Sequence, residues 1–334
     1  MHSAEFLDIM DCLAELLANT KMFVKCLMFW LNQQKFNEIL TMMKEDWADC
    51  VDNNINMLQT ASKAKTSNRI TSAILIFHTI SVVGYSTGVL LADVDVSNHT
   101  GELPLITKIE LSFDINAQRT YKSIVMTEFI LLILSTWTAG AMNALILTMT
   151  LHVAGQINIL RYWLKRLAPS DDESKNESIA IETTRIIRKH KKIIKFSENI
   201  ESLFTYIALV LFASNMIMIG CLAFVVVTAV GSPNAVEQII KSFLFYVLTN
   251  VEAYIFCYAG EHLKTKSKEI GLAAYNSTWY NMKSKNSRVL LFIILRSQKQ
   301  LTLTVGKMME LSLQSFTSII NASGSYLSIL LEMQ

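Results

Sequence analysis

The polar residues that interrupt long apolar segments are the ones best placed for chemistry. Glu252 stands inside the apolar stretch 242–260, where an ionisable side chain needs an internal partner or takes part in conduction or gating. The last segment repeats polar side chains every three or four residues, at Gln314, Ser318, Asn321, Ser325, Ser328 and Glu332. At about 100° per residue, this spacing places them in one narrow stripe on a helix. The stripe therefore predicts either a helix–helix seam or the lining of a water-filled pore.

Aromatic residues beside small ones are a second candidate site, because together they can enclose an apolar ligand. The residues that we predict to contact such a ligand are Gly84, Tyr85, Gly88, Trp137, Phe243 and Tyr246. The same residue types also form interfacial aromatic belts and ordinary core packing. The sequence leaves these alternatives open for each residue.

Patterns for catalysis and metal binding are missing from the sequence. The five cysteines include no CxxC pair, and the six histidines form no cluster at metal-ligand spacing. His78 and His152 lie within apolar runs, where a packed, hydrogen-bonded histidine is expected. HExxH, GxSxG and paired intramembrane aspartates are also absent. We therefore expect no enzyme activity, no metal and no cofactor.

The composition indicates a membrane protein. Hydrophobic residues make up 51% of the 334 residues and charged residues 17%, with a mean hydropathy of +0.34, whereas a soluble domain carries about a quarter charged residues. The apolar residues form blocks, and about 20 residues suffice to cross a bilayer. We predict an all-α, polytopic membrane helical bundle with spans at about 4–31, 70–92, 124–160, 202–231 and 236–260, then a last helix within 311–334.

The first of these spans has the weakest signal. Glu5, Asp8, Asp11 and Glu15 recur along one helical face, so this helix either spans with that face against other helices or lies at the interface. We favour spanning. All three prolines fall between the predicted spans, which predicts continuous helices and argues against a transporter built on broken helices.

Positive charge is concentrated in alternate connections. Ten Lys/Arg residues occur in 161–195 and eight in 264–299, but only three in 93–122. Basic connections belong in the cytoplasm, which puts the glycosylation sequon at Asn98 and the C-terminus outside the cell. Residue 1 would then also be outside, without a signal peptide, so we expect that an N-terminal span is missing. The net charge of +2 gives no reason to expect a nucleic-acid partner.

An ordered set of motifs in the C-terminal third resembles the insect odorant receptors. It comprises Cys257-Tyr-Ala-Gly-Glu261, Trp279-Tyr280, Arg296-Ser-Gln-Lys299, Gly306-Lys307 and Leu311-Ser-Leu313. His152-Val-Ala-Gly-Gln-Ile157 and Glu45-Asp46-Trp47 are similar to that family as well. The resemblance covers nearly the whole chain, and it makes the first segment equivalent to the family's second helix.

The resemblance implies a subunit of a ligand-gated, non-selective cation channel. Residues 1–260 would form a membrane bundle with an outer ligand cavity, 261–310 a cytoplasmic anchor region, and 311–334 the pore-lining helix. The implied anchor or assembly residues are Tyr275, Trp279, Tyr280 and Lys307. The predicted pore or gate residues are Ser318 and Asn321 of the polar stripe, together with Ser325, Ile329 and Met333, which the resemblance implies.

The predicted function is an odorant receptor subunit that binds small volatile molecules. It would work in a heterotetramer with the odorant-receptor co-receptor, in the lipid of the plasma membrane of olfactory sensory neurons. The alternatives are a gustatory receptor-type homotetramer and a G-protein-coupled receptor. The latter usually carries an Asn-Pro-x-x-Tyr kink and a cytoplasmic tail, and neither is present in the sequence.

Overall fold

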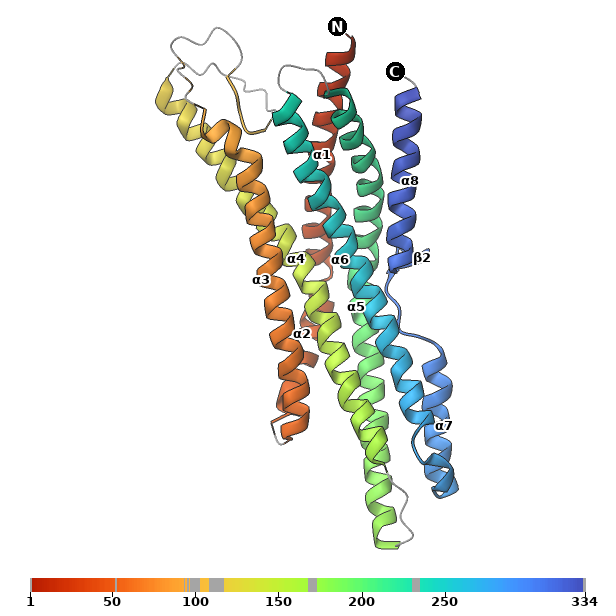
Figure 1. Ribbon diagram of the computed structural model, residues 1–334. Coiled ribbons are helices and arrows are strands. Elements are labelled where there is room, and N and C mark those ends of the chain that lie inside the picture. The colour runs from red at the N-terminus through yellow and green to blue at the C-terminus, as the bar shows by residue number, and fades with distance from the viewer. Residues whose placement is uncertain are drawn as a thin grey trace.

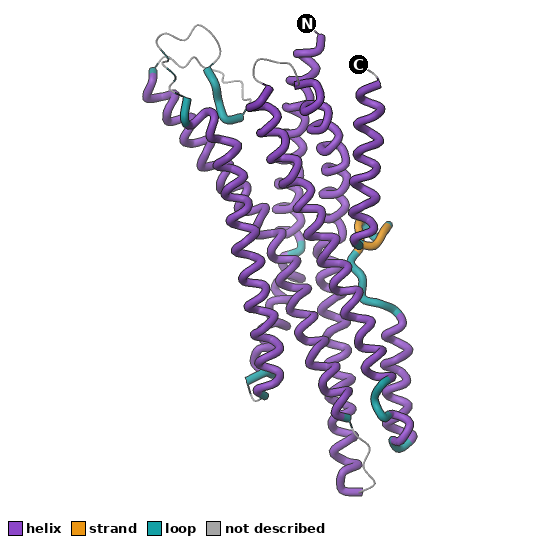
Figure 2. Tube along the Cα trace, viewed as in Figure 1, coloured by secondary structure: helices purple, strands orange, loops and turns teal. Residues whose placement is uncertain are grey.

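Long helices form nearly all of the described chain (Figures 1 and 2). The structure, a computed structural model, describes residues 2–51, 53–92, 94, 96, 103–107, 117–167, 173–229 and 235–332. In chain order the elements are α1 (His2–Leu31), α2 (Gln33–Ala48), α3 (Asn54–Leu90), α4 (Gln118–Arg166), α5 (Glu173–Ala229), α6 (Ala235–Tyr275), the 3-10 helix η1 (Trp279–Asn281), α7 (Ser284–Gln298), β1 (Thr304–Val305), β2 (Met309–Glu310) and α8 (Leu313–Glu332). The all-α prediction is confirmed, apart from one hairpin of two-residue strands.

Both termini lie at one end of the bundle (Figure 1). The carboxyl end of α3 and the amino ends of α4 and α6 lie beside the termini. Helix α7 and the start of α5 lie at the opposite end of the bundle. The basic stretches 161–195 and 264–299 therefore share one end of the molecule, away from the termini, as their alternation along the sequence predicts.

Four helical segments among the described residues are long and apolar enough to cross a membrane. They are Asn54–Leu90, Gln118–Arg166, Ile179–Leu222 and Ile239–Asn281. The 57 residues of α5 correspond to roughly 85 Å at about 1.5 Å per residue, far more than the roughly 30 Å of a hydrocarbon core. The basic half of α5 thus extends beyond the membrane. That α1 and α8 also cross the membrane remains a prediction from the sequence.

The core is built around α5, which packs against α1, α4, α6 and α8. Three aromatic rings connect α1, α5 and α6 through edge-to-face contacts: Phe29 lies 5.8 Å from Phe204, and Phe204 lies 6.0 Å from Phe256, between ring centroids. Rings at these distances add to the stabilisation from burying their apolar area. Phe204 and Phe256 are fully buried.

Local sequence signals fix where elements begin and turn. The Asn53 side chain accepts hydrogen bonds from the backbone N–H groups of Ile55 and Asn56, which caps α3. The β hairpin turns at Gly306 and Lys307, both with positive φ, at 57° and 62°. Thr205 of α5 accepts from the backbone N–H groups of both turn residues, at 2.9 and 3.1 Å. The hairpin therefore fixes the approach to α8 against α5.

Gly260 is the point where α6 comes closest to the start of α8. A methyl group on Gly260 would lie 2.6 Å from Cβ of Leu311 and would overlap the Leu311 carbonyl oxygen. Leu311 is buried, and α8 begins two residues later. Only a residue without a side chain fits this contact.

We expect Gly260→Ala to destabilise the protein by about 1–3 kcal/mol, because the added methyl group cannot be accommodated without shifting the backbone. Thermal unfolding of the purified protein in detergent measures the change. Gly324→Ala is the matched control, since no described atom lies within 4 Å of a methyl group there. Equal unfolding temperatures for the two variants would contradict the assigned contact.

Candidate functional site

A buried ion cluster connects α1, α5 and α6 inside the bundle. Lys21 Nζ lies 2.5 Å from Glu252 Oε2, and Lys25 Nζ donates to Glu252 Oε1. Lys21 also donates to Asn215 Oδ1 at 3.2 Å. The predicted internal partner of Glu252 is thus confirmed as a lysine pair. The sequence analysis missed these lysines, although their four-residue spacing places both on one face of a helix.

Two further polar side chains are buried in the upper bundle. His78 on α3 is 3% exposed, and its Nδ1 has no hydrogen-bond partner among the described residues. The ring of His78 lies against Gly140 of α4, where an added methyl group would be 3.1 Å from Cδ2. Asn143, one helical turn beyond Gly140, is fully buried, and neither atom of its side-chain amide has a described partner.

Three of the predicted ligand residues face neighbouring helices of the bundle. The Tyr85 hydroxyl donates to Glu15 Oε1 at 3.4 Å, and Lys241 Nζ lies 5.7 Å from the centre of the Tyr85 ring. A methyl group on Gly84 would lie 3.1 Å from Leu244 of α6. Tyr246 packs in a small apolar cluster whose other members are Met218, Leu222, Leu17, Ala18 and Phe245.

The other three predicted ligand residues are exposed, as Gly84 is. Gly88 is exposed, Phe243 is 58% exposed, and Trp137 is 47% exposed. Trp137 Nε1 donates to Thr79 Oγ1 at 2.9 Å, which joins α4 to α3. The structure therefore does not gather all six residues around one point, and their contact with ligand stays a prediction.

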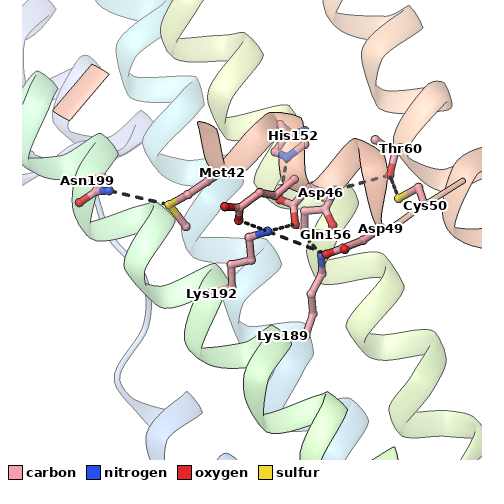
Figure 3. Close-up of polar contacts among 11 residues, drawn as sticks. Met42, Asp46, Asp49, Cys50, Thr60, His152, Gln156, Lys189, Lys192 and Asn199 are labelled. Carbon is pink, nitrogen blue, oxygen red and sulfur yellow. Dashed lines mark hydrogen bonds and ion pairs between the residues drawn. The ribbon is translucent and has the colours of Figure 1, made fainter. Parts of the chain in front are cut away.

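A second ion cluster lies in the basic half of the bundle (Figure 3). Asp46 of α2 accepts from Lys189 at 2.9 Å and pairs with Lys192 at 3.1 Å and His152 at 3.0 Å. Burial alone would raise the pKa of the Asp46 carboxyl, but the His152 hydrogen bond and the two lysines lower it to about 2. Asp46 thus ties α2 to α4 and α5, a role that the sequence analysis did not foresee.

The polar stripe of α8 faces away from its own chain. Gln314, Ser318, Asn321, Ser325 and Ser328 are all exposed, whereas Ile319 points into the core. The hydroxyls of Ser318, Ser325 and Ser328 donate to carbonyl oxygens one turn earlier in the same helix. The described part of the stripe therefore forms no seam with the chain's own helices. The side chains of Ile329 and Glu332, and residue Met333, lie outside the described residues, as does Asn98.

The predicted anchor residues occupy two places, and only the place of Tyr275, Trp279 and Tyr280 is at the basic end (Figure 1). Trp279 is half-buried against the main core and donates from Nε1 to the Tyr275 carbonyl oxygen at 3.2 Å. Tyr275 and Tyr280 are 63% and 68% exposed, so they are available to a neighbouring subunit. Lys307 lies apart from them, in the turn of the hairpin. Their part in assembly stays a prediction.

Comparison with known proteins decides the family. The model of the family described as 7tm Odorant receptor matches residues 5–324, nearly the whole chain. The chain belongs to the odorant receptor family. The resemblance seen in its sequence motifs is thereby confirmed.

Relatives of this odorant receptor-family chain come from insects. Odorant receptor 10 of Aedes albopictus is 30% identical over 181 residues, which are 54% of this chain and 47% of the relative. Odorant receptor Or2 of Anopheles gambiae is 27% identical over 226 residues, which are 65% of this chain and 58% of the relative. The matched regions thus span about half the length of these relatives.

The fold of the chain is that of a solved insect olfactory receptor. The structure of OR5 from Machilis hrabei in complex with eugenol matches with a TM-score of 0.81 at 13% sequence identity, covering 98% of this chain and 82% of that chain. A second structure of the same receptor matches with a TM-score of 0.77 at 15% identity, covering 98% of this chain and 82% of that chain. At these identities the likeness shows a shared fold.

We expect Asp46→Asn to lower the free energy of unfolding by about 3–5 kcal/mol, because it leaves two lysines without their buried counter-ion. Chemical or thermal unfolding in detergent measures this loss. Asp49→Asn is the matched control: Asp49 is 70% exposed and lies 4.0 Å from Lys192, so its loss should cost about 0–1 kcal/mol.

The Asp46 cluster also predicts a pH dependence. The pKa of Asp46 is about 2 in the folded protein against 3.8 ordinarily, so its contribution is present above pH 3.8 and is lost as the pH falls toward 2. The unfolding temperature of the wild type should therefore fall more steeply over this range than that of Asp46→Asn. Parallel curves for the two proteins would contradict this assignment.

Proposed function

We propose that this chain is the ligand-specific subunit of an odorant-gated, non-selective cation channel. It binds small volatile molecules and assembles with the odorant-receptor co-receptor into a heterotetramer. Its place is the plasma membrane of olfactory sensory neurons, with the C-terminus outside the cell.

The outward-facing polar stripe of α8 is the observation that carries this proposal. A polar helix face inside a membrane must meet water or protein, and the described stripe is not covered by its own chain. Several subunits around one axis bring such stripes together along a water-filled path. Membership of the odorant receptor family supports the same arrangement.

A route from ligand to pore follows α6. Glu252 of the buried ion cluster and Gly260, which touches Leu311, stand eight residues apart on α6, or about 12 Å along the helix. A ligand that favours one position of α6 therefore acts directly on the start of α8. Ligand affinities that differ by a few kcal/mol between closed and open states suffice to open the channel.

The ligand class is supported by the shared fold. OR5 of Machilis hrabei is described in complex with eugenol, a small volatile phenol. Apolar contacts with a few placed polar groups suit molecules of this kind. We therefore propose that the present chain also binds a small, mostly apolar odorant among its outer helices.

Expression of the full chain with the co-receptor tests the proposed function. We expect inward cation current in response to some members of a broad odorant panel, and no such current from the co-receptor alone. Current from this chain expressed alone would instead favour the gustatory receptor-type homotetramer. Silence toward every odorant, with surface delivery verified by labelling, would overturn the proposal.

The pore assignment has its own test in cysteine substitution along α8. We expect Asn321→Cys and Ser325→Cys to react with a charged thiol reagent applied outside during odorant exposure, and this modification to reduce the current. Ile319→Cys is the matched control, because Ile319 is 6% exposed and faces the core. Equal sensitivity of the three variants would contradict a water-lined stripe.

A further inference from the structure

By formal charge, the described side chains of the buried ion cluster are more positive than negative. Two ammonium groups, Lys21 and Lys25, share the single carboxylate of Glu252, and the third partner, Asn215, is neutral. Lys21 is 9% exposed, Lys25 2% and Glu252 5%. A lone positive charge among apolar helices is costly unless a negative group compensates it. By formal charge, the four described side chains of the cluster therefore sum to +1.

Unsatisfied polar atoms lie in the same part of the bundle. The Nδ1 atom of His78 and both side-chain atoms of Asn143 have no hydrogen-bond partner among the described residues, although these residues are 3% and 0% exposed. A buried amide without partners costs free energy, and it can donate two hydrogen bonds and accept others. Gly84 of α3 lies against Leu244 of α6, and His78 and Glu252 stand six and eight residues from this contact toward the same end of the bundle, because α3 and α6 run in opposite directions (Figure 1). These groups suit a small polar head group placed among them.

The face of α3 that carries His78 also leads outward to predicted ligand residues. Tyr85 stands seven residues after His78, which is two helical turns, about 10 Å further along nearly the same face. Gly84 beside Tyr85 faces Leu244 of α6. An elongated molecule with its apolar tail at Tyr85 would thus place its head near His78 and the lysines.

We infer that this buried centre of Lys21, Lys25, His78 and Asn143 binds the carboxylate head of a small organic acid, so that acidic odorants are the preferred ligands of this subunit. The inference rests on the proposed function and names its ligand class. A carboxylate would supply the missing negative charge and would accept hydrogen bonds from the ammonium and amide groups.

A purely structural role does not account for the composition of the centre. One lysine is enough to pair with Glu252 and hold α1 against α6. A second buried lysine adds a desolvation cost that this pair does not offset. Asn143 makes no described contact through its amide, so leucine, of similar size, would serve packing equally well.

Lys25→Met and Asn143→Leu are the variants that test the inference. Lys25→Met keeps a one-to-one pair of Lys21 with Glu252, so the fold retains its α1–α6 link. Asn143→Leu removes only unpartnered groups. Each is compared with the wild type in the complex with the co-receptor, using hexanoic acid, its methyl ester and hexanol as probes of equal chain length. Thermal unfolding of the purified chain with and without each probe gives a second readout that needs no channel activity.

For the wild type we expect a response to hexanoic acid at a concentration about tenfold or more below that needed for hexanol or the ester, and a rise in unfolding temperature with the acid. In Lys25→Met the acid should lose about tenfold or more in potency while the neutral probes change little. Asn143→Leu should weaken the acid response in the same direction.

Three outcomes would overturn the inference. The first is a wild type that prefers the neutral probes or shows no thermal shift with the acid. The second is an equal loss of response to all probes in Lys25→Met. The third is an ordered water or chloride as the only occupant of the centre in an experimental structure with the acid present. If neutral probes open the channel and the acid does not, the inference is overturned, but the proposed function is still supported.

Discussion

Charge that is buried among helices must be paired, and this constraint organises the upper half of the molecule. Glu252 can lie inside the bundle because Lys21 and Lys25 reach it from α1, and Asn215 joins the same group from α5. Removing Glu252 would leave both lysines without their carboxylate in an apolar setting. The position of α1 against α5 and α6 is therefore decided by electrostatics as much as by apolar packing.

The same rule operates again at the other end of the bundle. Asp46 collects Lys189, Lys192 and His152, and so holds α2 to α4 and α5. The two clusters lie at different levels along the bundle. The consecutive helices α1 and α2 are therefore held to the other helices by two separate ion clusters. Between them lies the aromatic series of Phe29, Phe204 and Phe256, which is apolar throughout.

The position of the start of α8 depends on close contacts of the preceding residues with α5 and α6. Gly260 lets α6 touch Leu311 directly, and the hairpin turn at Gly306 and Lys307 is hydrogen-bonded to Thr205 of α5. The start of α8 is therefore set by two neighbouring helices, whereas its polar stripe stays uncovered. A displacement of α6 relative to α5 would therefore reach this helix, as the gating that we propose for a ligand in the bundle requires.

The sequence by itself determined the class of fold, the helical segments, the single face of the α8 stripe and the family, because hydropathy, helical periodicity and ordered motifs are local properties. It also required a partner for Glu252. Only the tertiary structure decided that the partners are Lys21 and Lys25, that Asp46 has a structural role, and that Trp137 and Phe243 lie on exposed surfaces while Tyr85 faces α1 and α6. These pairings join residues up to 231 positions apart, and helix rotation and packing, which no local pattern encodes, select them.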